Sequence, residues 1–140
     1  MENDQSALRI LVVEDEADTA DSLAMILRLY GYDVLVAGDG LTALQMANEN
    51  SPDVVLLDIA LPKMDGWRVA KELRQQRAKK RPLIVAITGY GDKASRLRSQ
   101  EAGIDLHLVK PVDIGELNEL LADYQRSLCL LQSLGPSVGS

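Results

Sequence analysis

Side chains that can take part in phosphoryl chemistry stand at the ends of short apolar runs in this sequence. Glu14 and Asp15 follow one run, Asp58 follows another, and Thr88 and Lys110 close two more. A carboxylate can act as a nucleophile, several carboxylates together can bind a divalent cation, and a hydroxyl and an ammonium can hold the oxygens of a transferred phosphoryl group. These residue types therefore predict phosphoryl transfer, provided that the fold brings them together.

The apolar runs themselves predict a parallel sheet. Five runs rich in Val and Ile occur at 8–13, 33–37, 53–57, 83–88 and 106–110. Continuous apolar runs are typical of strands that are covered on both faces. Segments of helical period separate these runs, so we expect a doubly wound α/β fold. Right-handed crossovers give the five strands the order 2-1-3-4-5, the flavodoxin-like (βα)5 arrangement.

Each of the five helical segments carries one apolar stripe that can lie on the sheet. The stripes are Ala20, Leu23, Ala24, Leu27 and Tyr30; Leu41, Leu44 and Ala47; Val69, Ala70 and Leu73; Ala94, Leu97 and Ala102; and Leu117, Leu120, Leu121 and Tyr124. The fourth helix, expected over 92–102, has the least apolar surface and should be the most weakly held. Asp92 and Asp113 are expected N-caps, and Gly31 and Gly103 are expected C-terminal stops.

This fold brings the polar side chains together at one edge of the sheet. The first and third strands would be neighbours at about 4.8 Å, so the carboxylates at their ends are forced close to one another. Such like charges repel unless a cation lies among them, and an all-oxygen site of this kind suits Mg²⁺. Asp15 or Glu16 could instead merely cap the first helix. Five such residues at one sheet edge nevertheless argue for a site.

Four motifs at these strand ends resemble those of a known family. They are "VVEDE", "LLDIALPKMDG" around Asp58, "ITGYG" and "VKPVD". Together they closely resemble the CheY-like receiver domains of two-component response regulators, over residues 8 to 124. The resemblance implies a signalling module and not an enzyme, apart from magnesium-dependent self-phosphorylation and slow loss of the phosphoryl group.

The resemblance also implies a role for each residue of the site. Asp58 would be the phosphoacceptor, and its donor would be a histidine kinase or a histidine phosphotransfer protein. Mg²⁺ would be held by Asp15, Asp58 and the backbone carbonyl of Ala60, with Glu14 acting through water. Thr88 and Lys110 would bind the phosphoryl oxygens. A cis Lys110-Pro111 peptide would aim the lysine, and Pro62 and Gly66 fit a tight loop over the site.

Phosphorylation would act as a switch by adding negative charge to the site. Thr88 and Lys110 would move toward the phosphoryl oxygens, and the helix at 92–102 would shift with them. The readout face would comprise this helix, the following strand and the last helix. His107 stands where relatives usually have Tyr or Phe, so we expect Thr88 and His107 to be switch residues. Ala60 and Tyr90 provide no group that activates water, which predicts slow self-dephosphorylation.

Composition limits the class of partner and the location. The chain has 140 residues, 46% of them hydrophobic, a net charge of −6 and a single cysteine, Cys129. We expect no disulfide, signal peptide or membrane span, hence a cytoplasmic protein with a downstream protein target and no direct contact with nucleic acid or membrane. The basic stretch at 74–82 is interpreted as a solvated helix end.

The expected domain division is a disordered N-terminus at 1–7, a receiver domain at 8–124, and an extended C-terminal helix with a disordered tail at 125–140. The leucines of the extension predict packing back onto the domain, a homodimer, or contact with a helix of a partner protein. The module would be a stand-alone adaptor or a receiver from a hybrid kinase. The cognate kinase and the process controlled stay open.

Two other functions use a similar fold. A phosphatase of the haloacid dehalogenase type also has an aspartate nucleophile, but it needs a second aspartate where this chain has Ala60. An FMN-binding flavodoxin needs a phosphate-binding loop where this chain has Glu14 and Asp15. Both are therefore less well supported than the receiver interpretation.

Overall fold

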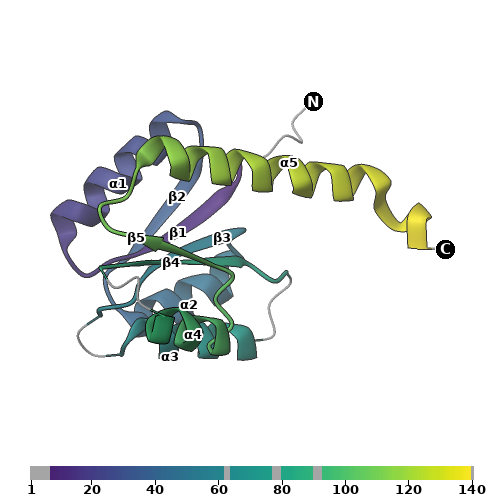
Figure 1. The fold of residues 1–140 in the computed structure, drawn as a ribbon. Helices are drawn as coiled ribbons and strands as arrows, with labels where there is room; N and C mark the ends of the chain where they lie inside the picture. The colour runs from purple at the N-terminus through teal and green to yellow at the C-terminus, as the bar shows by residue number, and fades with distance from the viewer. Residues whose placement is uncertain (1–6, 62–63, 77–79, 90–92, 140) are drawn as a thin grey trace.

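The computed structural model contains one five-stranded parallel sheet flanked by helices (Figure 1). It describes residues 7–61, 64–76, 80–89 and 93–139, the last eight of these by their backbone alone. The strands are β1 (Arg9–Val13), β2 (Asp33–Ala37), β3 (Val54–Asp58), β4 (Leu83–Thr88) and β5 (Leu106–Val109). The helices are α1 (Ala17–Leu29), α2 (Gly40–Asn50), α3 (Gly66–Gln75), α4 (Lys93–Glu101) and α5 (Ile114–Gly139). The strand order is β2-β1-β3-β4-β5, which confirms the predicted fold and topology.

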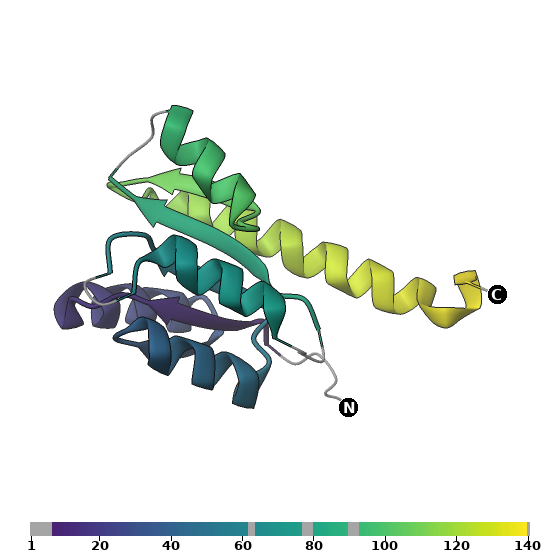
Figure 2. The ribbon, with the colours of Figure 1, turned by 90° about the horizontal axis from the view of Figure 1, so that it is seen from below.

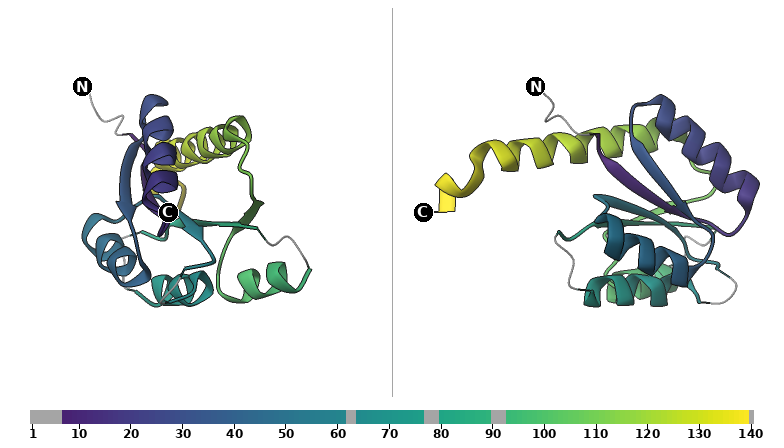
Figure 3. Two further views of the ribbon diagram at one scale, coloured as in Figure 1. Left: turned by 90° about the vertical axis from the view of Figure 1, so that its left-hand side faces the viewer. Right: turned by 180° about the vertical axis from the view of Figure 1, so that it is seen from behind.

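The sheet separates two hydrophobic cores. Helices α1 and α5 cover one face, and α2, α3 and α4 cover the other (Figure 3). Successive residues of the central strand β3 serve the two cores in turn, because side chains alternate along a strand: Val55 and Leu57 pack with α2 and α3, while Val54 and Leu56 pack with α1 and α5. All five residues of β3 are buried, as the continuous apolar run predicts.

The helix ends follow the expected chemistry at most positions. Gly31 and Gly103 have positive φ angles of 96° and 90°, so both predicted C-terminal stops are confirmed. Asp113 accepts a hydrogen bond from the Glu116 N–H at 3.1 Å, which confirms this N-cap. The other expected N-cap, Asp92, lies outside the described residues.

Four stripe residues expected on the sheet are instead exposed, among them the small Ala94. Tyr30 is 49% exposed, Leu41 70% and Leu97 56%. Tyr30 is the C-cap of α1, and Leu41 lies beside the positions through which α2 packs, which are Gly40, Ala43 and Ala47. In α4 only Ser99 is buried, so the prediction that this helix buries the least apolar surface is confirmed.

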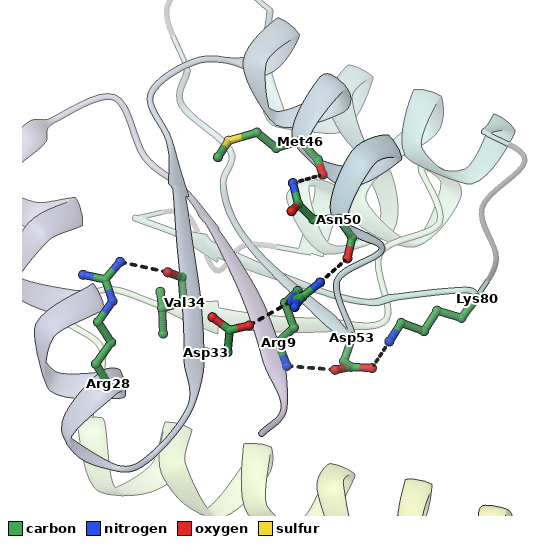
Figure 4. A network of polar contacts seen from close by, with 8 residues as sticks. All are labelled: Arg9, Arg28, Asp33, Val34, Met46, Asn50, Asp53 and Lys80. Atoms are coloured by element: carbon green, nitrogen blue, oxygen red, sulfur yellow. Dashed lines mark hydrogen bonds and ion pairs between the residues drawn. The ribbon is translucent and has the colours of Figure 1, made fainter. Parts of the chain in front are cut away.

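Polar contacts brace the edge of the sheet where the strands begin (Figure 4). The Asp53 carboxylate accepts from the Arg9 N–H at 2.8 Å and from Lys80 Nζ at 2.6 Å. Arg9 in turn donates to Asp33 at 2.9 Å and to the carbonyl of Asn50 at 2.9 Å. This network joins the starts of β1, β2 and β3 to the connection before β4.

The basic stretch is only partly a solvated helix end, so that interpretation was wrong for Arg74. Its side chain is 16% exposed, and its guanidinium donates to Asp105 at 2.6 Å and to the carbonyls of Pro82 and Gly103 at 2.8 and 2.9 Å. Burial lowers the pKa of Arg74, an effect that the Asp105 charge opposes. Arg74 therefore ties the end of α3 to the starts of β4 and β5. Residues 77–79 of the stretch lie outside the described residues.

Helix α5 extends well beyond the sheet (Figures 1 and 2). Leu117 and Leu121 are fully buried against the sheet, Tyr124 and Leu128 are partly buried, and Leu131 is 66% exposed. Residues 135–139, expected to be disordered, continue the helix, because adding residues to an existing helix costs far less than starting one. Residues 1–6 of the expected disordered N-terminus lie outside the described residues. None of the described helices is both long enough and apolar enough to cross a membrane.

Two leucines of α5 provide a matched test of this packing. Leu121→Ala should lower the free energy of unfolding by about 2–5 kcal/mol, because it leaves a cavity between α5 and the sheet. Leu131→Ala removes the same atoms from an exposed position and should change it by less than about 0.5 kcal/mol. Urea denaturation followed by circular dichroism measures both. Equal losses in the two variants would contradict the packing described here.

Candidate functional site

Asp58 is the last residue of β3 and is buried at the rim of the sheet. It is 6% exposed and pairs in register with Ile87 of β4. Its Oδ1 accepts a hydrogen bond from the backbone N–H of Ala60 at 3.0 Å. A charge at the end of a fully buried strand is costly unless other groups compensate it, so the neighbours of Asp58 decide what the site can do.

Two further carboxylates lie beside Asp58. Glu14 and Asp15 directly follow β1, whose last residue, Val13, pairs with Leu57 of β3. One oxygen from each of Glu14, Asp15 and Asp58 lies within 4.8 Å of the others. The structure thus brings together the three acidic residues that the sequence placed at neighbouring strand ends.

Glu14 is the more enclosed of the two residues after β1. Its side chain is 10% exposed, and its Oε2 accepts a hydrogen bond from the Glu16 N–H at 3.1 Å. Burial raises the pKa of Glu14 above its ordinary value; the Glu16 hydrogen bond opposes this rise, and the nearby charge of Asp58 adds to it. Glu14 therefore experiences directly the electrostatic cost of the acidic cluster.

The simpler interpretation of the acidic residues as helix caps is not what the structure shows. Glu16 occupies the N-cap position of α1, but its side chain makes no capping hydrogen bond. Its carboxylate instead accepts from the hydroxyl of Thr19. Capping by the Glu16 side chain therefore does not explain this acidic segment.

Lys110 provides the positive charge of the site. It follows β5, and its Nζ lies 3.4 Å from Asp58 Oδ2 and 3.8 Å from Glu14 Oε1. The Lys110-Pro111 peptide is cis, as predicted. Three carboxylates and one ammonium leave two formal negative charges uncompensated among these four residues. A divalent cation would balance them, and carboxylate oxygens are the ligands that Mg²⁺ prefers, so the residues present fit this ion.

Thr88 and His107 lie at different positions along their strands. Thr88 ends β4, is 2% exposed, and accepts a backbone hydrogen bond from the Lys110 N–H at 2.8 Å. His107 is half-buried on β5 in register with Ala86, two residues below the Thr88 pair, or about 6.6 Å along the strand. Thr88 therefore belongs to the rim, whereas His107 lies below it.

The loop after Asp58 is held close to the strand by Gly66. The Gly66 N–H donates to the carbonyl of Ile59 at 2.9 Å. A Cβ at position 66 would lie 2.6 Å from Ile59 Cα and 2.8 Å from the carbonyl oxygen of Asp58. Both are backbone atoms that cannot move aside, so this position requires glycine. Pro62, expected in the same loop, lies outside the described residues.

One feature of the site was not expected from the sequence. An apolar groove of about 730 Å³ opens between α1 and the start of α5 and reaches Asp58 and Lys110. Leu23, Ile26 and Val112 contribute to its aliphatic lining. The sequence gives only a weak indication of this groove: Ile26 is an apolar residue of α1 outside the predicted apolar stripe.

The sequence profile of the response regulator receiver domain matches residues 10–122. The chain belongs to this family. Receiver domains are signalling modules of two-component systems. Curated relatives are regulators: the alkaline phosphatase synthesis transcriptional regulatory protein PhoP of Bacillus subtilis is 39% identical over 110 residues, 79% of this chain and 45% of that protein. The response regulator MprA of a Mycobacterium species is 37% identical over 132 residues, 94% of this chain and 54% of that protein. This receiver thus spans about half the length of these relatives.

Solved receiver structures share the fold. The receiver domain of the sensor histidine kinase PA1611 from Pseudomonas aeruginosa, with a magnesium ion coordinated in its active site cleft, has a TM-score of 0.77 and 31% identity, over 85% of this chain and 98% of that one. The chemotaxis protein CheY4 of Vibrio cholerae has a TM-score of 0.79 and 27% identity, over 84% of this chain and 98% of that one.

The acidic cluster predicts a specific effect of charge removal. Asp15→Asn should raise the free energy of unfolding by up to about 1 kcal/mol in magnesium-free buffer, because it removes one of three repelling charges. The same change should abolish most of the stabilisation that added Mg²⁺ gives to the unaltered receiver. Thermal denaturation with and without Mg²⁺ measures both effects.

Asp21→Asn is the matched control, since it removes one exposed charge from α1 outside the cluster. If this control reproduced the behaviour of Asp15→Asn, a general charge effect would explain the result and the metal site would be rejected.

Proposed function

We propose that this receiver accepts a phosphoryl group on Asp58 from the phosphohistidine of a histidine kinase or a histidine phosphotransfer protein, in the presence of Mg²⁺. The observation that carries the proposal is the position of Asp58: a buried carboxylate whose Oδ2 faces Lys110 at 3.4 Å, within a cluster of three carboxylates. This arrangement supplies a nucleophile and the charge compensation that phosphoryl transfer requires.

The transfer exchanges one bond for another. A carboxylate oxygen of Asp58 forms a bond to phosphorus while the bond between phosphorus and the donor's imidazole nitrogen breaks. The electron pair of the broken bond stays with the imidazole, and the product on Asp58 is a mixed anhydride. Lys110 and the hydroxyl of Thr88 bind the phosphoryl oxygens.

Magnesium would be held by Asp15, Asp58 and the backbone carbonyl of Ala60, with Glu14 acting through water. When bound, the ion supplies positive charge to the phosphoryl oxygens. The magnesium in the cleft of the PA1611 receiver supports this proposal. The indirect role of Glu14 is supported by its hydrogen bond, because one of its two carboxylate oxygens already accepts the Glu16 N–H.

The phosphoryl group would switch the face formed by α4, β5 and α5. Movement of Thr88 toward the phosphoryl oxygens would pull on the chain that leads to α4. The side chain of His107, two residues before the end of β5, would change its conformation in response. Apolar side chains on this face support its use in binding a downstream protein: Leu97 is 56% exposed, and Leu106 and Val109 are each 41% exposed. An equilibrium between two conformations, biased by one charged group, describes the switch.

The proposal includes the phosphodonor protein, the downstream target and a predicted homodimer. The apolar groove beside Asp58 offers a surface for the protein that donates the phosphoryl group. We propose that the downstream target is a protein, that this receiver makes no direct contact with nucleic acid, and that it is located in the cytoplasm. A homodimer through residues 125–139 stays a prediction, supported by Leu130 and Leu131, which are 65% and 66% exposed.

Incubation with acetyl phosphate and Mg²⁺ tests the phosphoacceptor. Intact-protein mass spectrometry should show one added phosphoryl group on the unaltered receiver and none on Asp58→Asn, which keeps the shape of the side chain but lacks a nucleophilic carboxylate. Turnover of other phosphoesters would favour the phosphatase alternative. Labelling of Asp58→Asn at the same site would reject the proposal.

The lifetime of the product provides a separate test. Position 60 holds an alanine, which cannot activate water as an acidic or amide side chain could. The acyl phosphate should therefore persist for minutes or longer after the donor is removed. Introducing a carboxylamide with Ala60→Asn should shorten this lifetime. A half-life of a few seconds in the unaltered receiver would contradict the prediction.

A further inference from the structure

The only tryptophan of the chain, Trp67, connects α3 to α4. Its indole Nε1 donates to the hydroxyl of Ser99 at 3.0 Å. The guanidinium carbon of Arg98 lies 4.1 Å from the centroid of the indole ring, which is a favourable cation–π distance. Arg98 also lies 3.9 Å from the carboxylate of Asp65. One residue of α3 thus contacts two consecutive residues of α4.

These contacts hold a helix that buries little else. Ser99 is the only buried residue among those of α4, and Ala102 just beyond the helix adds a small apolar contact. Ala94 and Leu97 of the expected apolar stripe are exposed. A buried hydroxyl is costly when it is left without a partner, so the Trp67 hydrogen bond favours the observed position of α4.

The other end of this connection is fixed to the phosphoacceptor. Trp67 directly follows Gly66, whose N–H donates to the carbonyl of Ile59, the residue after Asp58. The backbone of Gly66 lies so close to Ile59 and Asp58 that no side chain fits between them. Asp65 also caps α3 by accepting from the Arg68 N–H at 2.9 Å. Trp67 is therefore anchored on the side of Asp58, and Ser99 lies on the helix proposed to move.

We propose that Trp67 is a positioning residue that fastens α4 to the first turn of α3 and sets how readily α4 moves when Asp58 is phosphorylated. The fastening depends only on the contacts described above. The effect on switching rests on the proposed function. The two parts therefore need separate measurements.

Amide hydrogen exchange tests the fastening without any phosphodonor. Trp67→Phe keeps an aromatic ring but loses the N–H, and Ser99→Ala removes the acceptor. Each should accelerate exchange in residues 93–102 about fivefold, as expected for the loss of one hydrogen bond. Gln100→Ala, an exposed neighbour on α4, is the matched control. If neither variant differed from this control, the fastening would be rejected.

Two further readouts test the effect on switching. Addition of beryllium fluoride with Mg²⁺, which imitates the phosphoryl group, should change the Trp67 fluorescence of the unaltered receiver. The change should be smaller in Ser99→Ala, because its α4 is held less firmly before the ligand binds. Phosphorylation by acetyl phosphate should be about fivefold faster in Ser99→Ala, while its affinity for Mg²⁺ stays the same, a difference that a merely structural role would not produce.

The outcomes separate this inference from the proposed function. Normal phosphorylation of Asp58, with unchanged exchange in both variants and an unchanged fluorescence response and phosphorylation rate in Ser99→Ala, would overturn the role of Trp67 alone. Faster exchange in the variants without any phosphorylation of Asp58 would support the fastening and overturn the proposed function together with the effect on switching.

Discussion

The crowding of three carboxylates, two of which contact the ammonium of Lys110, is the constraint on which the site depends. It follows from the topology, because β1 and β3 are parallel neighbours whose carboxyl ends meet at the same edge. Burial of both strands among aliphatic side chains stabilises the sheet and offsets the repulsion between the carboxylates. A site with two uncompensated negative charges responds strongly to any cation or phosphoryl group that enters it, and this sensitivity is what a signalling module requires.

The two ends of the parallel strands differ in the side-chain contacts that join them to neighbouring elements. Where the strands begin, Arg9, Asp53 and Lys80 join neighbouring elements, and Arg74 binds Asp105 together with two backbone carbonyls. Where the strands end, the charges of the site repel one another, and α4 has a single buried residue. We therefore expect local stability to be greater where the strands begin than where they end. Local stability of this uneven kind is typical of proteins that switch.

The sequence predicts the sheet and the rim residues because both depend on short-range patterns. Continuous Val- and Ile-rich runs identify the strands, the right-handed crossover rule orders them, and a polar residue at the end of a run marks the rim. Contacts between distant elements have no such pattern. Nothing near Trp67 in the sequence indicates Ser99 as its partner, and nothing near Arg74 indicates Asp105. The groove beside α1 was missed for the same reason, since its walls come from separate elements.

The shared position of Lys110 explains how a small local change could move a helix. Its ammonium lies 3.4 Å from Asp58 and 3.8 Å from Glu14, both longer than the distance of about 2.8 Å that is usual for a charge-assisted hydrogen bond. Lys110 therefore makes a long hydrogen bond to Asp58 and an ion pair with Glu14. Phosphoryl oxygens on Asp58 would offer it closer partners, and a metal ion would compensate Glu14 in its place. Because the Lys110 N–H also donates to the Thr88 carbonyl, a shift of Lys110 acts directly on the end of β4, from which the chain continues to α4. In the proposed switch, a small redistribution of charge at the rim would be enough to move α4, because this helix buries only one of its residues.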